Sequence, residues 1–189
     1  MNGNVEFYGE LRRNRKWNGK GYDINGNLTY ELDNGNGKVM EYEYTEYEHY
    51  LIFRGEYLNG IRYGNGREYI ENCLIFDGKY LNGKRNGKGR EYNNNGDLKF
   101  VGEYLNGKRN GKGTEYYSKN KMAFDGEFLY GKKIGKGKEY YENGNIKFIG
   151  EYSNGKRNGK GREYNSEGNL IFKGNFENGE RKINYYKKI

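Results

Sequence analysis

The sequence contains no proline, one cysteine and one histidine among its 189 residues. Because Cys73 is the only cysteine, no disulfide can form within the chain, which favours a reducing compartment or indifference to redox. A zinc site needs three or four ligands of matched spacing, so His49 is expected to be solvated or to lie on a strand face. Cys73 has no histidine or second cysteine nearby in sequence and is expected to be a packing residue rather than a nucleophile.

Long apolar runs are also missing. No 18 consecutive residues are apolar, and the first residues, MNGNVEFYGELRRNRK, lack an apolar run of signal-peptide length. The recurring GKG segments lack the GxxxxGK[ST] order of a phosphate-binding loop. We therefore expect a soluble, non-enzymatic protein with no cofactor, no bound metal and no small-molecule substrate. Its expected location is cytoplasmic, either free or peripheral at a membrane or cytoskeletal structure.

One segment is copied many times along the chain. Residues 102–116 read GEYLNGKRNGKGTEY. Close copies begin at Gly55, Gly78, Gly126 and Gly150, and a truncated copy begins at Gly174. Successive copies are 23 or 24 residues apart, which is the signature of a repeat array. The first 50 residues are less regular but leave room for two more repeats, so we expect seven full or nearly full repeats and one partial repeat.

The alternation within each repeat predicts β-strands. Leu98, Phe100, Gly102 and Tyr104 occupy every second position, which places them on one face of a strand. A helix would need spacings of three and four. Asn-Gly pairs between the strands tolerate the positive φ angles of tight hairpin turns. The chain is therefore predicted to be all-β, an elongated array of about seven to eight antiparallel β-hairpin repeats.

The second strand of each repeat carries glycines at alternate positions. In residues 111–116, Gly111, Gly113 and Glu115 are expected to share one face. Alternating glycines weaken a strand unless a bulky group lies on its backbone, and the aromatic rings of the neighbouring strand are the expected group. The glutamate recurs in every GREY-type segment. It is therefore expected to form a structural ladder that accepts hydrogen bonds from tyrosine or lysine, and not to act in acid-base catalysis.

The GxYxxGxxxGxG core, with an aromatic residue two places before its first glycine and a period of 23 to 24 residues, resembles the MORN repeat (membrane occupation and recognition nexus). The resemblance extends from Val5 to Arg181 and is most specific from Leu51 to Phe176. It implies an elongated, twisted antiparallel β-array. The expected parts are degenerate MORN-like repeats at 1–50, the regular array at 51–180 and a C-terminal cap at 181–189.

Members of this family are mostly scaffolds and linkers that join membranes to the cytoskeleton and dimerise, and they have been proposed to bind phosphoinositides. The resemblance implies a non-catalytic scaffold or adaptor that mediates protein-protein interaction through the array. The alternative is a peripheral membrane module that binds acidic phospholipids.

The net charge of +8 is unevenly placed, because residues 1–96 hold 14 basic and 14 acidic residues whereas residues 97–189 hold 20 and 12. Four basic pairs share one turn position and are expected to line up along one edge as a basic row: Lys84-Arg85, Lys108-Arg109, Lys132-Lys133 and Lys156-Arg157. Such a row can be a solvated edge, or it can face a protein partner or an acidic lipid surface. Nucleic acid is not expected, because most tyrosines lie in line with the core face and cannot form a stacking platform.

The ends of a hairpin array leave strands with unpaired N–H and C=O groups. The chain finishes in KINYYKKI, where Ile183, Tyr185, Tyr186 and Ile189 are candidates for self-association. A monomer capped by these residues and a homodimer formed at this end are both open at this point, and the MORN resemblance favours the homodimer.

Overall fold

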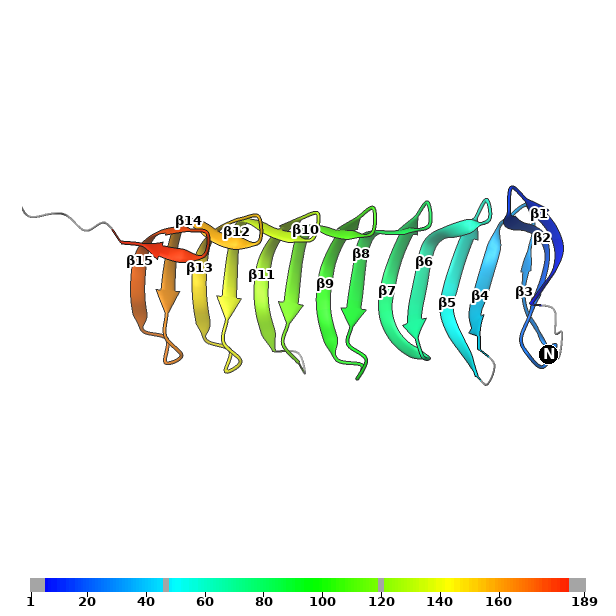
Figure 1. Cartoon of the computed structure of the whole chain (residues 1–189), viewed down its shortest axis with the longest axis horizontal. Helices are drawn as coiled ribbons and strands as arrows, with labels where there is room; N and C mark the ends of the chain where they lie inside the picture. Colours follow the sequence, from blue (N-terminus) through cyan, green and yellow to red (C-terminus); the bar gives the residue numbers. More distant parts are fainter. Residues whose placement is uncertain (1–5, 46–47, 119–120, 184–189) are drawn as a thin grey trace, which may run out of the picture. The chain divides into compact units, whose positions relative to one another are not determined.

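The computed structural model of the chain describes residues 6–45, 48–118 and 121–183. All regular secondary structure in these ranges is β-strand (Figure 1). The chain divides into two compact units, residues 1–96 and 97–189. The all-β class and the hairpin repeats predicted from the alternating pattern are confirmed.

In the N-terminal unit, antiparallel strands follow one another in sequence order. They are β1 (Phe7–Arg12), β2 (Arg15–Tyr22), β3 (Leu28–Leu32), β4 (Gly37–Tyr44), β5 (His49–Leu58), β6 (Ile61–Ile70), β7 (Cys73–Leu81) and β8 (Lys84–Tyr92). Strands β1 to β3 form one sheet in that order, and from β4 to β8 each strand pairs with the next. Each hairpin is therefore built from neighbours in the sequence.

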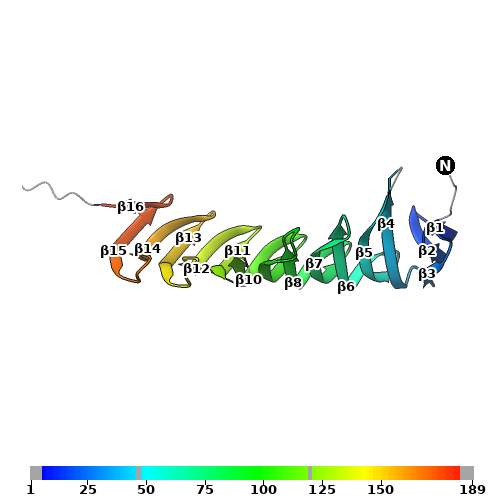
Figure 2. The same ribbon diagram turned by 90° about the horizontal axis from the view of Figure 1, so that it is seen from below.

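The C-terminal unit continues the same pattern. Its strands are β9 (Leu98–Leu105), β10 (Lys108–Tyr116), β11 (Met122–Leu129), β12 (Lys132–Tyr140), β13 (Ile146–Ser153), β14 (Lys156–Tyr164), β15 (Leu170–Glu177) and β16 (Glu180–Lys182). From β9 to β16 each strand pairs antiparallel with the next, and β16 is the short last strand (Figure 2).

The Asn-Gly turns have the predicted conformation. Asn106 and Gly107 have φ angles of 51° and 85°, in the left-handed region that a tight two-residue turn requires. A turn glycine also donates its N–H to the preceding repeat, as Gly131 N does to Arg109 O at 2.8 Å. Successive hairpins of the C-terminal unit are thus joined at their turns as well as along their strands.

The second strand of each regular hairpin contains a bulge. Residues 109–113 of β10 lie opposite residues 102–104 of β9, because the pairing register shifts there. Gly111 lies in this bulge with a φ of 92°, and a Cβ on it would meet the Glu103 carboxylate. The prediction that Gly111 and Gly113 share one face beneath a ring is therefore wrong for Gly111, because the bulge interrupts the strict alternation.

Phenylalanine rings form the core of each unit. Fully buried are Phe53 and Phe76 in the N-terminal unit and Phe100, Phe124 and Phe148 in the C-terminal unit. These rings lie on paired glycines: a Cβ on Gly66 would come within 2.6 Å of Phe53 Cζ, and a Cβ on Gly113 would overlap the Phe100 ring. The prediction that rings cover these glycines is confirmed. Burying each such side chain stabilises the fold by about 1.5 to 3 kcal/mol.

The rings also contact one another from repeat to repeat. Phe124 packs edge to face against Tyr152 of the next repeat, with ring centroids 5.1 Å apart, and Phe148 packs against Phe176 at 4.9 Å. We call the sheet face that carries these rings the aromatic face. The opposite face, which carries the alternate residues such as Lys138, is called the polar face.

Candidate functional site

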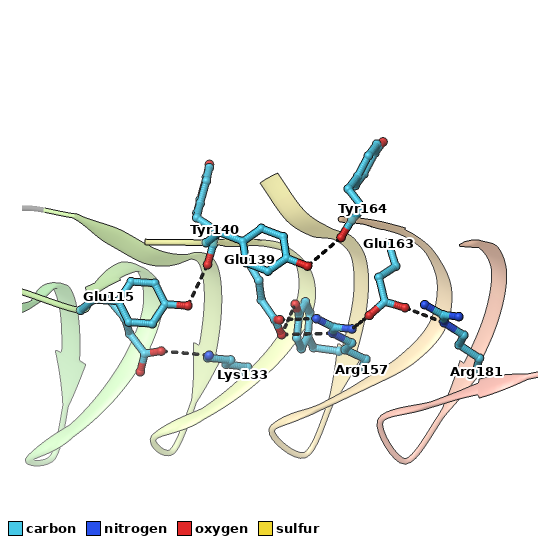
Figure 3. Close-up of polar contacts among 11 residues, drawn as sticks. Glu115, Lys133, Glu139, Tyr140, Arg157, Glu163, Tyr164 and Arg181 are labelled. Atoms are coloured by element: carbon cyan, nitrogen blue, oxygen red, sulfur yellow. Dashed lines mark hydrogen bonds and ion pairs between the residues drawn. The ribbon is translucent and has the colours of Figure 1, made fainter. Parts of the chain in front are cut away.

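Acidic and basic side chains alternate over the aromatic face. The glutamate of each GREY-type segment meets the second residue of a basic pair. In the C-terminal unit the set consists of Arg109, Glu115, Lys133, Glu139, Arg157, Glu163 and Arg181, most of which Figure 3 shows. We call this set, and its counterpart in the N-terminal unit, the charge ladder.

The charge ladder connects successive repeats. Arg157 forms an ion pair with Glu139 of the preceding repeat and another, at 2.8 Å, with Glu163 of its own hairpin (Figure 3). Glu163 in turn accepts a bond from Arg181 Nε at 2.6 Å. Each of these side chains is only partly exposed, so the pairs are less screened by solvent than surface ion pairs.

Each cation of the charge ladder also lies over a core ring. The guanidinium carbon of Arg157 is 4.3 Å from the Phe148 ring centroid, and Lys133 Nζ is 4.2 Å from that of Phe124. A cation above an aromatic face is attracted by the negative face of the ring. The cation is therefore held between a carboxylate and a ring, which explains its low exposure.

The N-terminal unit has the same arrangement. Arg62 bonds Glu41 at 2.8 Å and lies 4.1 Å above the Phe53 ring. Glu68 pairs with Arg85 and accepts a hydrogen bond from Tyr80 at 2.6 Å. The predicted glutamate ladder is confirmed, with donors that include Tyr80 and Lys133, but most of its donors are arginines, which the prediction did not name. Glu41 was missed as a member, although the Glu-Tyr pair that it begins matches the end of each GREY segment.

The charge ladder shifts the pKa values of its members. Burial raises the pKa of the Glu68 carboxyl, but hydrogen bonds from Arg85 and Tyr80 outweigh this effect and hold the pKa below its ordinary value. The pKa of Glu139 is lowered in the same way, since Arg157 offsets the effect of burial. The pKa of Tyr80 is raised, first by burial and then by its bond to the carboxylate. At neutral pH these carboxylates are ionised and bonded to cations.

The two members of each predicted basic pair lie in different places. The second members, Arg85, Arg109, Lys133 and Arg157, are partly buried in the charge ladder. The first members, Lys84, Lys108, Lys132 and Lys156, are exposed beside the turns. Adjacent residues of a strand point to opposite faces, which accounts for the separation. Anion binding by the basic row stays a prediction, and its exposed part is reduced to the four lysines.

The comparison with known families gives four consecutive matches. Residues 76–98, 100–122, 124–146 and 148–170 each match the MORN repeat. The chain belongs to the MORN-repeat family. MORN is a non-enzymatic type of repeat and is consistent with a module that interacts with proteins or membranes. A search of curated proteins found no match to the chain.

The MORN hairpins also expose leucines that the sequence reasoning did not single out. Leu81 is 44% exposed and pairs across its hairpin with Lys84. In the C-terminal unit, Leu105 and Leu129 are 41% and 44% exposed and pair with the first lysines of their own hairpins. The sequence signal that could have identified these leucines is their position directly before the turn, beyond the last ring of the aromatic face. The hairpin ends thus present leucine and lysine together.

Tyrosines connect the MORN repeats at the other end of the hairpins. Tyr117 donates its hydroxyl hydrogen to the carbonyl oxygen of Tyr140 at 2.8 Å, and Tyr141 donates to that of Tyr164 at 2.9 Å (Figure 3). These tyrosines lie outside the ring core and were not predicted to bridge repeats.

The candidate self-association residues are only partly described. Ile183 follows β16 and is 56% exposed, whereas Tyr185, Tyr186 and Ile189 lie outside the described residues. Strand β16 pairs with only three residues of the eight-residue strand β15. The described ranges therefore leave the homodimer as a prediction.

The remaining candidates differ in outcome. His49 lies in β5, and its expected strand-face position agrees with that. Cys73 is exposed, so the expectation that it is a packing residue is wrong; it begins β7 directly after a turn. Within the described ranges, no three His, Cys, Asp or Glu side chains are grouped to hold a metal ion. The described residues also contain no helix of the length and apolarity needed to cross a membrane.

Proposed function

We propose that the protein is a non-catalytic scaffold or adaptor that binds other proteins through the exposed hairpin ends of its MORN repeats. The observation that carries this proposal is the recurrence of an exposed leucine beside an exposed lysine at equivalent positions, as in Leu105 with Lys108 and Leu129 with Lys132. Exposed apolar side chains rimmed by polar ones are typical of protein interaction sites.

The charge ladder supports a structural rather than a catalytic use of the glutamates. Glu139 and Glu163 are bonded to arginine, and both have pKa values below the ordinary range in spite of burial. A general acid at neutral pH needs a raised pKa, and a general base needs a free lone pair directed at substrate. We therefore infer that the protein acts by binding. We propose a cytoplasmic location, because a chain with one cysteine forms no internal disulfide and needs no oxidising compartment.

Affinity capture with the full chain tests this proposal. We expect a variant with both Leu105→Ser and Leu129→Ser to lose partners that the parent captures. It should fold normally, because Ser153 occupies the same position in a following repeat. The matched control is Ile171→Ser, which removes an apolar side chain of similar exposure, 48%, from β15. If the double variant captures the same proteins as the parent, the hairpin ends are not the binding surface.

The runner-up function is a peripheral membrane module, favoured by the exposed lysines at the hairpin ends. Co-sedimentation with vesicles, with and without anionic lipid, distinguishes the two functions. Binding to an acidic membrane should fall as salt is raised, and it should fall again when Lys108, Lys132 and Lys156 are changed to glutamine. Binding that needs neither anionic lipid nor these lysines would count against this function.

We also propose self-association at the C-terminal end. Arg181 pairs with Glu163, so a truncation should keep it and remove only residues 183–189. Light scattering of the full chain should give the mass of a dimer, and the truncated chain that of a monomer. A dimer that survives the truncation would contradict this proposal.

A further inference from the structure

A groove of about 490 Å³ lies on the polar face of the C-terminal unit, over β13, β14 and β15. It is lined by Ile149, Lys160, Gly161, Arg162, Lys173, Gly174 and Asn175. Lys160, Arg162 and Lys173 are all exposed. Among the described residues that line the groove, three are cationic and none is a carboxylate. We call it the basic groove.

The strand register brings like charges together in the basic groove. Arg162 and Lys173 are direct cross-strand partners on β14 and β15, and Lys160 is opposite Asn175. Asn175 is also opposite Lys182 of β16. Like charges directly opposite each other destabilise a sheet. An anionic ligand over these strands would offset that repulsion.

The preceding groove of the same face shows what the basic groove lacks. That groove, of about 360 Å³, is lined by three lysines but also by Asp125 and Glu127. The register places Lys112 opposite Glu127 and Lys138 opposite Asp125. The positions of Asp125 and Glu127 in their repeat are those of Lys173 and Asn175 in the last repeat. Arg162 likewise stands where the earlier copy has Thr114, so three differences between copies of the repeat convert a balanced groove into a cationic one.

The N-terminal unit shows the balanced arrangement as well. Arg54 and Arg67 are cross-strand partners on β5 and β6, and Arg67 also forms an ion pair with Asp77 at 3.2 Å. Asp77 holds the position in its repeat that Lys173 holds in the last one. Asp77 thus balances part of the charge of the Arg54–Arg67 pair. The repeat that carries Lys173 has no carboxylate at this position.

We propose that the basic groove binds an acidic segment of a protein partner. The groove spans three strands, a width of about 10 Å between the outer two, which fits one extended peptide. A planar anionic membrane would also face Asp125 and Glu127 on β11 of the same face, and these would repel it. Glu151, on β13 at one side of the groove, accepts a hydrogen bond from Lys160 N at 3.1 Å. Ile149 adds an apolar contact at one side of the groove. The proposal goes beyond the scaffold function, because it assigns a second surface and a partner chemistry.

The test uses the full chain and a fluorescein-labelled peptide of glutamate residues, followed by fluorescence anisotropy. We expect saturable binding that weakens as salt is raised. A variant with Lys173→Asp and Asn175→Glu gives β15 the carboxylates that Asp125 and Glu127 provide in β11, and it should bind about tenfold more weakly or worse. No saturable binding by the parent at low salt would overturn the proposal.

The matched control is Arg54→Asp with Asn25→Glu, which makes the same change in net charge on exposed residues of the N-terminal unit. This control should change the affinity by no more than about threefold, because neither residue lies on the strands of the groove. An equal loss in both variants would show that only net charge matters and would overturn the proposal. These variants leave Leu105 and Leu129 unchanged, so failure of the scaffold test and failure here are distinguishable.

A gain variant keeps the test decisive if the loss variant does not fold. Asp125→Lys with Glu127→Asn gives β11, two repeats earlier, the groove residues of β15 and should raise the number of peptides bound per chain. Vesicles containing phosphatidylserine form the last arm. If vesicles bind the parent in a manner that depends on Lys173 while the peptide does not, the ligand is a membrane and the peptide assignment is wrong.

Discussion

Two hairpins of the N-terminal unit have similar sequence patterns and different pairing registers. In the β5–β6 hairpin, Phe53 is paired with Glu68, a member of the charge ladder. In the β1–β2 hairpin, Phe7 is paired with Gly21 instead. The difference arises because the glycine of β1 pairs with the first glycine of its GKG segment, whereas the glycine of β5 pairs with the second glycine of the equivalent segment.

The shifted register changes the packing around the ring. Phe7 is only half-buried and stacks nearly parallel to Tyr30 at a centroid distance of 6.5 Å. Its cation, Lys16, is 5.5 Å above the ring and pairs with Glu6. Phe53, in contrast, is fully buried and has Arg62 at 4.1 Å. The two hairpins therefore differ in glycine register, and the segment GKGYD at the end of β2 also lacks the Glu-Tyr pair that supplies Glu68 in β6.

The largest expected difference concerns the rings. Phe53→Ala should lower the free energy of unfolding by about 3 to 5 kcal/mol, because it leaves a cavity in a fully buried position. Phe7→Ala should cost less, about 1 to 2 kcal/mol, since that ring already contacts solvent. Urea unfolding of both variants measures the difference. Equal costs would show that the two hairpins are packed alike.

The next effect concerns the glycine beneath the ring. Gly66→Val should destabilise by about 1 to 3 kcal/mol, because even its Cβ would come within 2.6 Å of Phe53 Cζ. The control is Gly26→Asn, in an open turn with φ of 79°, where asparagine tolerates the left-handed conformation. The control should melt within a few degrees of the parent. A Gly66→Val protein that does the same would refute the ring assignment.

A smaller effect is expected from the charge ladder. Glu68→Gln should cost about 1 to 2 kcal/mol, because it removes the charge that Arg85 and Tyr80 bond. Glu6→Gln, in the first hairpin, should cost less than about 1 kcal/mol, because Glu6 is 40% exposed. A double-mutant cycle between Glu68→Gln and Arg85→Gln isolates the pair energy. A coupling energy near zero between Glu68 and Arg85 would contradict a stabilising role of the charge ladder.

The smallest expected effect is the dependence of stability on pH. Glu68, Glu139 and Glu163 have lowered pKa values, so their contribution is present above the ordinary value of 4.5 and is lost as the pH falls through the lower folded pKa. Tyr80 and Tyr152 have raised pKa values, so their contribution is lost as the pH rises above 10.0. Melting temperatures should therefore fall at both extremes. Glu68→Gln should flatten the acid side, and an unchanged acid side would argue against the assignment.

The strands and the ring core could be predicted because they depend on a local property, the alternation of side chains along a strand. Phe100 and Gly113 were assigned in this way to one face, where the structure places them. The bulge at Gly111 could not be predicted, because it depends on a mismatch of length between two paired strands. The alternation of side chains along one strand does not show where that strand has more residues than its partner.

The candidate site was predictable only in part. The recurring glutamates were recognised as structural, but Arg85 was grouped with Lys84 because the two share a turn position. The alternation of side chains explains why Arg85 points to the aromatic face. Its ion pair with Glu68 depends on the packing of a neighbouring hairpin. The basic groove was not visible in the sequence, since Arg162 and Lys173 become neighbours only through the strand register.

The bridging of repeats by Arg157 has a consequence for how the C-terminal unit unfolds. Phe148 is fully buried because Phe176 of the next repeat lies against it, and Arg157 bonds glutamates of two repeats. Phe172 is only half-buried, and its cation, Arg181, is 5.2 Å away. Repeats that stabilise one another in this way unfold from an end of the unit inward, because an end repeat has only one neighbour. Amide hydrogens of β15 should therefore exchange with solvent faster than those of β13, and one more full repeat after β15 would slow that exchange.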